Sequence, residues 1–170
     1  MCTCRLIGIT LALSLLMVCC GKEARPLAVY DLNGDGHADE WIYTYGKSGV
    51  KVALDTNFDG KPDLIETFHN GQLTEIERDR NHDGKIDEVE RYRQGHLYMV
   101  ATDNNYDGKP ETVDIYRRGR LAIAEYDPNA TGAVQRADYY DDHGKVVRTV
   151  VRGASAHSGQ LIENLANLMQ

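Results

Sequence analysis

Residues 79–102 read DRNHDGKIDEVERYRQGHLYMVAT, and this 24-residue unit decides the fold. Its first nine residues follow the pattern Asp-x-Asn-x-Asp-Gly-x-x-Asp. The pattern recurs from positions 31 and 55, and from position 103 with Glu in ninth place. A decayed copy starts at position 127. Because the five starts are spaced 24 residues apart, the segment 29–151 is predicted to be one array of five repeats.

The second half of each unit predicts a β-hairpin. An aromatic residue, a Gly three positions later and a Leu two further on recur from Phe68, Tyr92 and Tyr116. This spacing is typical of a strand, a tight turn and a second strand. Segments such as 41–45 and 50–54 are rich in aromatic and β-branched residues, which favour strands. We therefore expect an all-β fold of about ten strands, an antiparallel meander or a solenoid-like sheet with the loops along one edge.

A short helix after each loop is the competing interpretation. Residues 87–94 contain helix formers, and Gly95 stands where a helix would stop. Against it, Trp41-Ile-Tyr-Thr-Tyr45, in the same part of its repeat, is a poor helix and a good strand. Strand is therefore the prediction for every repeat.

The N-terminus predicts export. The apolar run 6–18, preceded by Arg5, is too short for a membrane-spanning helix of about 20 residues and is typical of a secretory signal. It ends in Val18-Cys19-Cys20, which resembles a bacterial lipobox. The resemblance implies a signal peptide over 1–19, lipidation of Cys20 with Cys19 as the alternative, an anchor or linker over 20–28, and a membrane as partner. Lys22 resembles outer-membrane sorting in a Gram-negative cell. An ordinary cleaved signal with incidental cysteines is the other interpretation.

The C-terminal segment 152–170 has a different composition. It begins as a polar linker, and residues 161, 162, 165, 168 and 169 are apolar positions that share one face of a helix. We expect a short helix that caps the end of the repeat array. A frayed tail is the alternative.

The nine-residue loops are predicted to bind Ca²⁺, which takes six to eight oxygen ligands. Side chains at positions 1, 3, 5 and 9 offer carboxylate or amide oxygens, Gly at position 6 makes the bend, and position 7 offers its backbone carbonyl. Position 12 is a further acid, expected to bind only if the chain leaves the loop as a helix, because a strand carries it about 10 Å away. The candidate ligands are Asp31, Asn33, Asp35, His37 and Asp39; Asp55, Asn57, Asp59, Lys61, Asp63 and Glu66; Asp79, Asn81, Asp83, Lys85, Asp87 and Glu90; and Asp103, Asn105, Asp107, Lys109, Glu111 and Asp114.

The loop pattern resembles the calcium loops of EF-hand, FG-GAP and thrombospondin type 3 repeats, and the hairpin half is similar to YD and MORN repeats. The resemblance covers the loop and implies that position 9 is a direct ligand. Turn chemistry alone is the alternative, since Asn and Asp cap their own backbone and Gly takes positive φ. It leaves the crowding of carboxylates in four loops unexplained. The fifth loop has Thr131 and Gln135 in place of two acids, so about four Ca²⁺ ions are expected.

Charge and motifs narrow the function. The net charge of −7 argues against nucleic acid as a partner. No phosphate loop, nucleophile elbow or His-x-x-x-His pair occurs, so we expect no enzyme. The sequence favours a calcium-stabilised structural or adhesive module of the cell envelope that contacts an envelope protein or a glycan. A calcium-responsive regulator and an auxiliary subunit of an envelope complex are the alternatives.

Overall fold

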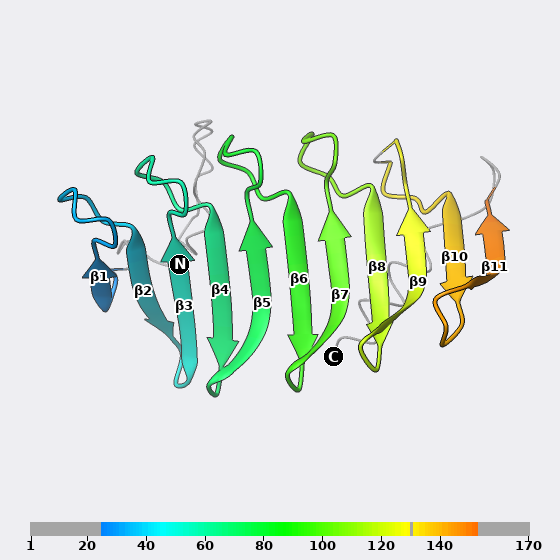
Figure 1. The fold of residues 1–170 in the computed structure, drawn as a ribbon, viewed down its shortest axis with the longest axis horizontal. Helices are drawn as coiled ribbons and strands as arrows, with labels where there is room; N and C mark the ends of the chain where they lie inside the picture. Colours follow the sequence, from blue (N-terminus) through cyan, green and yellow to red (C-terminus); the bar gives the residue numbers. More distant parts are fainter. Residues whose placement is uncertain (1–24, 130, 153–170) are drawn as a thin grey trace, which may run out of the picture.

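The computed structural model describes residues 25–129 and 131–152, which form one antiparallel sheet of 11 strands in sequence order (Figure 1). This confirms the all-β prediction and, of its two forms, the open meander. The strands are β1 (Ala28–Tyr30), β2 (Glu40–Tyr45), β3 (Gly49–Leu54), β4 (Leu64–His69), β5 (Gln72–Arg78), β6 (Glu88–Arg93), β7 (His96–Thr102), β8 (Thr112–Arg117), β9 (Arg120–Tyr126), β10 (Arg136–Tyr140) and β11 (Val146–Val151). The strand before the first loop, β1, was not among those expected.

The short turns lie at one end of the strands and the nine-residue loops at the other (Figure 1). Asn70 and Gly71 join β4 to β5 with φ values of 50° and 73°. Two consecutive residues with positive φ are typical of a type I′ hairpin turn, whose twist matches that of the strands. The equivalent pairs at 94–95 and 118–119 have the same signs, which confirms the predicted tight turns. The helix considered for residues 87–94 is wrong, because β6 occupies that segment.

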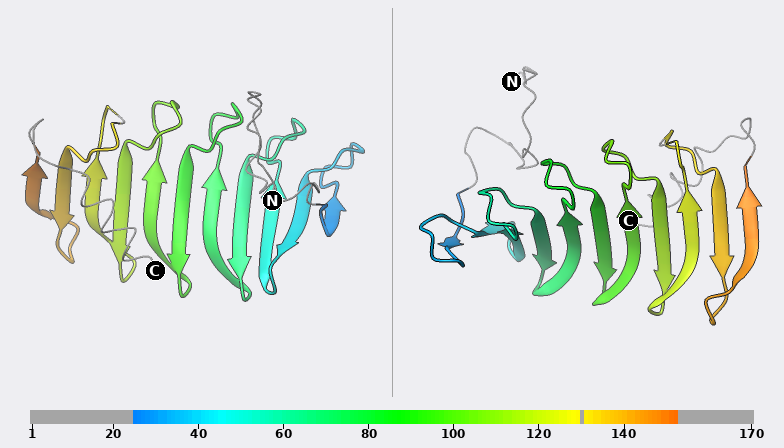
Figure 2. Two further views of the ribbon diagram at one scale, coloured as in Figure 1. Left: turned by 180° about the vertical axis from the view of Figure 1, so that it is seen from behind. Right: turned by 45° about the horizontal axis from the view of Figure 1, so that its top comes forward.

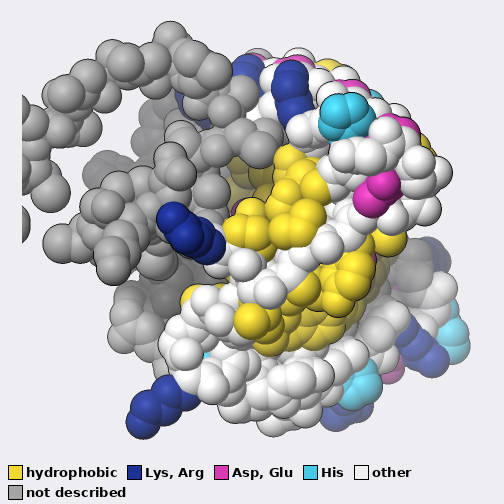
Figure 3. All heavy atoms as spheres, turned by 90° about the vertical axis from the view of Figure 1, so that its left-hand side faces the viewer, with side chains coloured by type: hydrophobic (Ala, Val, Ile, Leu, Met, Phe, Trp, Pro, Cys, Tyr) yellow, Lys and Arg dark blue, Asp and Glu magenta, His cyan; other side chains and the backbone are white. Residues whose placement is uncertain are grey.

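The sheet is a single layer, as the two further views show (Figure 2). An end-on view from the β1 side shows hydrophobic side chains gathered in a hollow of the sheet (Figure 3). Most of the buried side chains among the described residues are nevertheless acids: nine carboxylates are buried, compared with five apolar side chains. Apolar burial is the main driving force of ordinary folding. A sheet with so few buried apolar side chains needs another source of stability, and the buried acids are candidates for it.

Several predictions fall on residues outside the described ranges: the signal peptide, the lipidation at Cys20 or Cys19, and the C-terminal helix. In the part of the chain that the structure does describe, no helix is long and apolar enough to cross a membrane.

Candidate metal-binding loops

The loops follow β1, β3, β5, β7 and β9 and are called loop one (31–39), loop two (55–63), loop three (79–87), loop four (103–111) and loop five (127–135). The first four share a series of side-chain turns. In loop three, Asn81 Oδ1 accepts the N–H of Asp83 at 2.9 Å, and Asp83 Oδ1 accepts the N–H of Lys85 at 2.9 Å. Both bonds recur in loops one, two and four, at 2.7–3.0 Å. The side chains at positions 3 and 5 are therefore fixed by the loop's own backbone.

The carboxylate at position 1 fixes the glycine bend. Asp79 Oδ2 accepts the N–H of Gly84 at 2.7 Å, and Gly84 has φ of 90°. The corresponding Asp–Gly bond is present in all five loops at 2.6–2.9 Å. A residue with a Cβ is strained at this φ, so Gly is required at position 6.

The acid at position 9 connects the end of the loop to its beginning by hydrogen bonds. Asp87 Oδ2 accepts the N–H groups of Arg80 and Asn81, at 2.8 and 3.2 Å, and Asp39 does the same in loop one with the N–H groups of positions 2 and 3. In loop four, Glu111 Oε2 accepts the N–H of Asn104 at 2.7 Å. The first and last acids of a loop thus lie at its base, where the two strands enter and leave.

Most of the acids at the loop bases are buried, although Asp31 of loop one is exposed. Asp39, Asp55, Asp87 and Asp103 are each 2% exposed, and Asp63 and Asp79 are 6% and 5% exposed. A backbone bond ties each loop to the next, from the N–H at position 1 to the carbonyl oxygen at position 9 of the preceding loop, at 2.7–2.8 Å for Asp55, Asp79, Asp103 and Asp127. From Asp39 onward, buried carboxylates therefore follow one another along this edge of the sheet, and burying charge without a counter-charge is costly.

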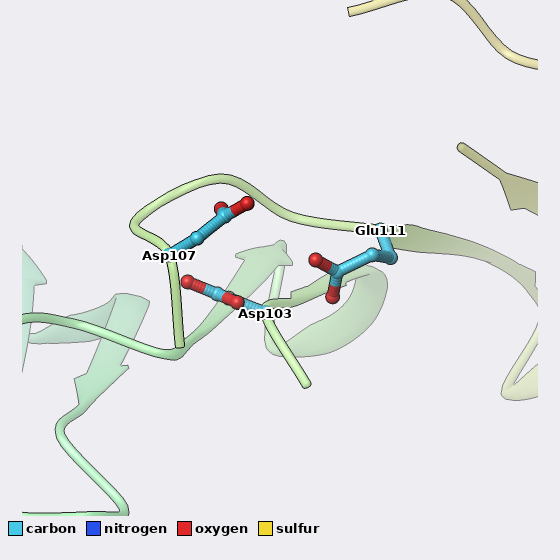
Figure 4. Close-up of side chains that lie close together, drawn as sticks. All are labelled: Asp103, Asp107 and Glu111. Atoms are coloured by element: carbon cyan, nitrogen blue, oxygen red, sulfur yellow. The ribbon is translucent and has the colours of Figure 1, made fainter. Parts of the chain in front are cut away.

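Loop four assembles its acids most closely. Oxygens of Asp103, Asp107 and Glu111 lie within 4.8 Å of one another, and among the described residues this is the one group of three such side chains. The three carboxylates face a common space inside the loop (Figure 4). Glu111 Oε1 is buried and has no hydrogen-bond partner, and in loop three Asp87 Oδ1 is in the same condition. Both atoms belong to the acid at position 9, which was expected to be a direct ligand because the loop pattern resembles known calcium loops.

Loop five replaces acids with hydrogen-bond donors. Thr131 Oγ1 donates to Asp127 Oδ1 at 3.0 Å, and Gln135 Nε2 donates to the same oxygen at 3.4 Å. The N–H groups of Gly132 and Ala133 donate to Asp127 Oδ2. Burial by itself would raise the pKa of Asp127, but the bonds from Thr131 foremost, and then those from Gly132 and Ala133, hold the pKa below its ordinary value. The donors of loop five thus satisfy its single carboxylate.

The acids at position 12 lie in strands, away from the loop bases. Glu66, Glu90 and Asp114 are the third residues of β4, β6 and β8 and pair across the sheet with Ile76, Val100 and Ala124. This is the strand exit for which we expected no bond to the ion of their own loop.

The contacts of Glu90 agree with this placement. Glu90 Oε1 lies 2.5 Å from Arg78 Nη1, and Glu90 Oε2 accepts the hydroxyl of Tyr92. Burial, followed by this contact with Glu90, raises the pKa of Tyr92 to about 12. Glu90 therefore belongs to a polar cluster on the sheet face.

At position 7, the residues His37, Lys61, Lys85 and Lys109 donate their backbone N–H to the carboxylate at position 5. One of their side chains also contacts that acid, since Lys85 Nζ lies 4.0 Å from Asp83 Oδ2. The backbone carbonyl at this position remains a predicted ligand.

Two residues near the loop bases were not predicted. Thr56 Oγ1 donates to Asp63 Oδ1 at 2.7 Å, and His82 Nδ1 of loop three lies 3.5 Å from Asp63 Oδ2 of loop two. Positions 2 and 4 differ from repeat to repeat, so the repeat pattern contains no signal for either contact.

Comparisons with known proteins do not assign a function. No family model matches the chain, and no curated protein matches it. One solved structure with partial similarity is the S. aureus TarM G117R mutant in complex with fondaparinux, alpha-GlcNAc-glycerol and UDP, with a TM-score of 0.41, 17% identity, and coverage of 50% of this chain and 17% of that one. Another contains accessory secretory protein 1, 2 and 3 of Streptococcus pneumoniae, with a TM-score of 0.42, 17% identity, and coverage of 78% and 22%. This chain thus spans about a fifth of each.

Proposed function

We propose that the protein is a calcium-binding, non-enzymatic lipoprotein of the cell envelope that acts as a structural or adhesive module. The observation that carries the calcium proposal is the pair of buried, unpartnered carboxylate oxygens, Asp87 Oδ1 and Glu111 Oε1. A buried charged oxygen without a partner is strongly unfavourable, and a hard cation is the ligand that satisfies several such oxygens at once.

Loops four and five provide an internal comparison. Loop four has three carboxylates within 4.8 Å and an unpartnered oxygen, whereas loop five has one carboxylate surrounded by donors. The same backbone bend serves both, since Gly108 and Gly132 have φ values of 88° and 80°. Turn chemistry therefore needs only the loop-five arrangement. The additional acids are explained if each of loops one to four binds its own cation.

Calcium binding also accounts for the stability of a thin sheet. Residues 25–152 contain no Cys, so no disulfide stabilises this part of the chain. An ion that binds only the folded loops adds its binding free energy to folding, about 2.7 kcal/mol for each site at a free concentration one hundred times Kd. Extracellular calcium modules have Kd values on the order of 10⁻⁴ to 10⁻³ M, which suits a protein outside the cytoplasm.

The proposed partner is an envelope protein or a glycan, bound by the sheet, with the membrane as anchor through a lipid on Cys20. Arg and Tyr side chains are already stacked along the strands: Arg93 lies 4.9 Å from the Tyr98 ring centroid, and Arg148 lies 5.3 Å from that of Tyr139. Amphipathic aromatic and Arg side chains are common at binding surfaces. A repetitive sheet held by ions suits presentation of such groups better than catalysis.

Calorimetric titration of the protein with Ca²⁺, together with circular dichroism, tests the proposal. We expect binding heat for about four sites, and Asp83→Ala should remove about one of them. Asp142→Ala, an exposed acid in the turn between β10 and β11, is the matched control and should leave the heat unchanged. Absence of binding heat and an unchanged spectrum would refute the calcium proposal. Loss of the strand signal on chelation would favour the regulatory role over the structural one.

A further inference from the structure

Loops two and three contact each other through more than the backbone. A pocket between them is lined by Asp59, Lys61 and Asp63 of loop two and by Asp79, His82 and Gly84 of loop three. Within it, His82 Nδ1 lies 3.5 Å from Asp63 Oδ2, and the N–H of Asp79 donates to the carbonyl oxygen of Asp63 at 2.8 Å. A residue of loop three therefore lies directly against a proposed ligand of loop two.

Asp63 is held differently from its counterparts. In loops one and three, one carboxylate oxygen at position 9 accepts the N–H groups of both position 2 and position 3. Asp63 Oδ2 instead accepts the N–H of Thr56 at 3.0 Å, while its Oδ1 accepts the Thr56 hydroxyl at 2.7 Å. With both oxygens bonded to one residue, the remaining side of Asp63 Oδ2 is covered by the imidazole of the next loop.

His82 has the left-handed backbone conformation that position 4 also has in loops one, two and four. It occupies position 4 of loop three with φ of 60°, and the side chain is 41% exposed on its outer side. A non-glycine residue in this left-handed region is strained and uncommon, so the conformation has to be maintained by its surroundings. Loop one has Gly34 at the same position, with φ of 80°, so the bend itself does not require His.

We propose that His82 is a positioning residue for the calcium site of loop two. This role rests on the proposed calcium function and extends it. The His82 imidazole orients the Asp63 carboxylate and shields it from water. Groups that contact ligand side chains from outside the coordination sphere commonly alter metal affinity by about 10- to 100-fold. Because His82 is partly exposed and 3.5 Å away, we expect an effect below this range, about three- to tenfold.

The test is a calcium titration of the ¹⁵N-labelled full chain followed by NMR. The amide of the glycine at position 6 reports each loop separately, because it donates to the position-1 carboxylate: Gly36, Gly60, Gly84 and Gly108. The variant is His82→Gly, which copies loop one and accepts the positive φ. Tyr106→Gly, at position 4 of loop four with φ of 63°, is the matched control.

We expect His82→Gly to move the Gly60 midpoint to about three- to tenfold higher calcium while the Gly84 midpoint moves less than about twofold. Tyr106→Gly should leave the Gly60 midpoint unchanged. A Gly60 midpoint that stays in place, or that moves no more than Gly84, would overturn the role of His82, since a merely weakened loop three would affect Gly84 first. Wild-type glycine amides that do not respond to calcium would overturn the calcium proposal itself, and this inference with it.

Discussion

Replacing Glu111 by Gln tests the calcium proposal most directly, because it should raise stability without calcium and reduce the stabilisation that calcium adds. The amide keeps the length of the side chain, and its Oε1 can still accept the N–H of Asn104. It removes one negative charge from the group of three acids in loop four. Loop five has Gln135 at this position, so the residue is compatible with the bend.

The magnitude follows from the geometry of loop four. Two like charges 4.8 Å apart repel by about 3.5 kcal/mol at an effective dielectric constant of 20, and by about 0.9 kcal/mol in water. The first value applies to the buried Asp103 and the second to the exposed Asp107. Without calcium, Glu111→Gln should therefore raise the free energy of unfolding by about 1–4 kcal/mol.

With calcium this gain is offset by the loss of the site. The wild-type site contributes about 2.7 kcal/mol at a free concentration one hundred times Kd, and about 4.1 kcal/mol at one thousand times Kd. The variant loses this contribution because Gln offers a neutral oxygen in place of a carboxylate. The calcium-induced increase in the free energy of unfolding should thus be smaller in the variant by about that amount.

Urea denaturation of both proteins, in excess chelator and in excess calcium, measures all four values. Glu125→Gln is the matched control, since Glu125 is a buried acid of β9 and lies outside the loops. Its effect should be the same in both conditions. The reasoning is refuted if Glu111→Gln is destabilising in chelator, or if its response to calcium equals that of the wild type.

Three further predictions concern the fifth loop, a buried acid and a turn. Changing Thr131 and Gln135 together to Asp restores the acids at positions 5 and 9, so the Gly132 amide should acquire a calcium-dependent NMR shift that is absent from the wild type. Burial raises the pKa of Glu125, although the charge of Arg152 opposes this. The folded state therefore binds the Glu125 proton more tightly than the unfolded state, and stability falls as pH rises above about 4.3. Glu125→Gln should consequently raise Tm at pH 7 and have little effect at pH 4, and an equal gain at both would contradict the assignment. Gly71→Ala places a Cβ at φ of 73° and should reduce the free energy of unfolding by about 1 kcal/mol or more, whereas Gln72→Ala, beside it in β5, should change it by less than half as much.

The repeat determined much of the fold in advance. Asp-x-Asn-x-Asp-Gly predicted the loop bends, and the Gly71, Gly95 and Gly119 turns predicted the hairpins, because both depend on local backbone preferences and positive φ. The segment 87–94 was ambiguous, since its residues suit a helix almost as well as a strand. Pairing of β6 with β5 and β7 decides it, and pairing is a property of the whole sheet.

By itself the sequence determined which residues can serve as ligands, since a period of 24 brings the same oxygens to the same place in every loop. Only the tertiary structure decided which of them share an environment. Glu90 faces Arg78 on the sheet because β6 begins directly after Asp87, and His82 meets Asp63 because adjacent loops lie two strands apart. The reason is physical: ligand type and bend are local properties of the chain, whereas burial and contacts between loops arise only when separate repeats pair in one sheet.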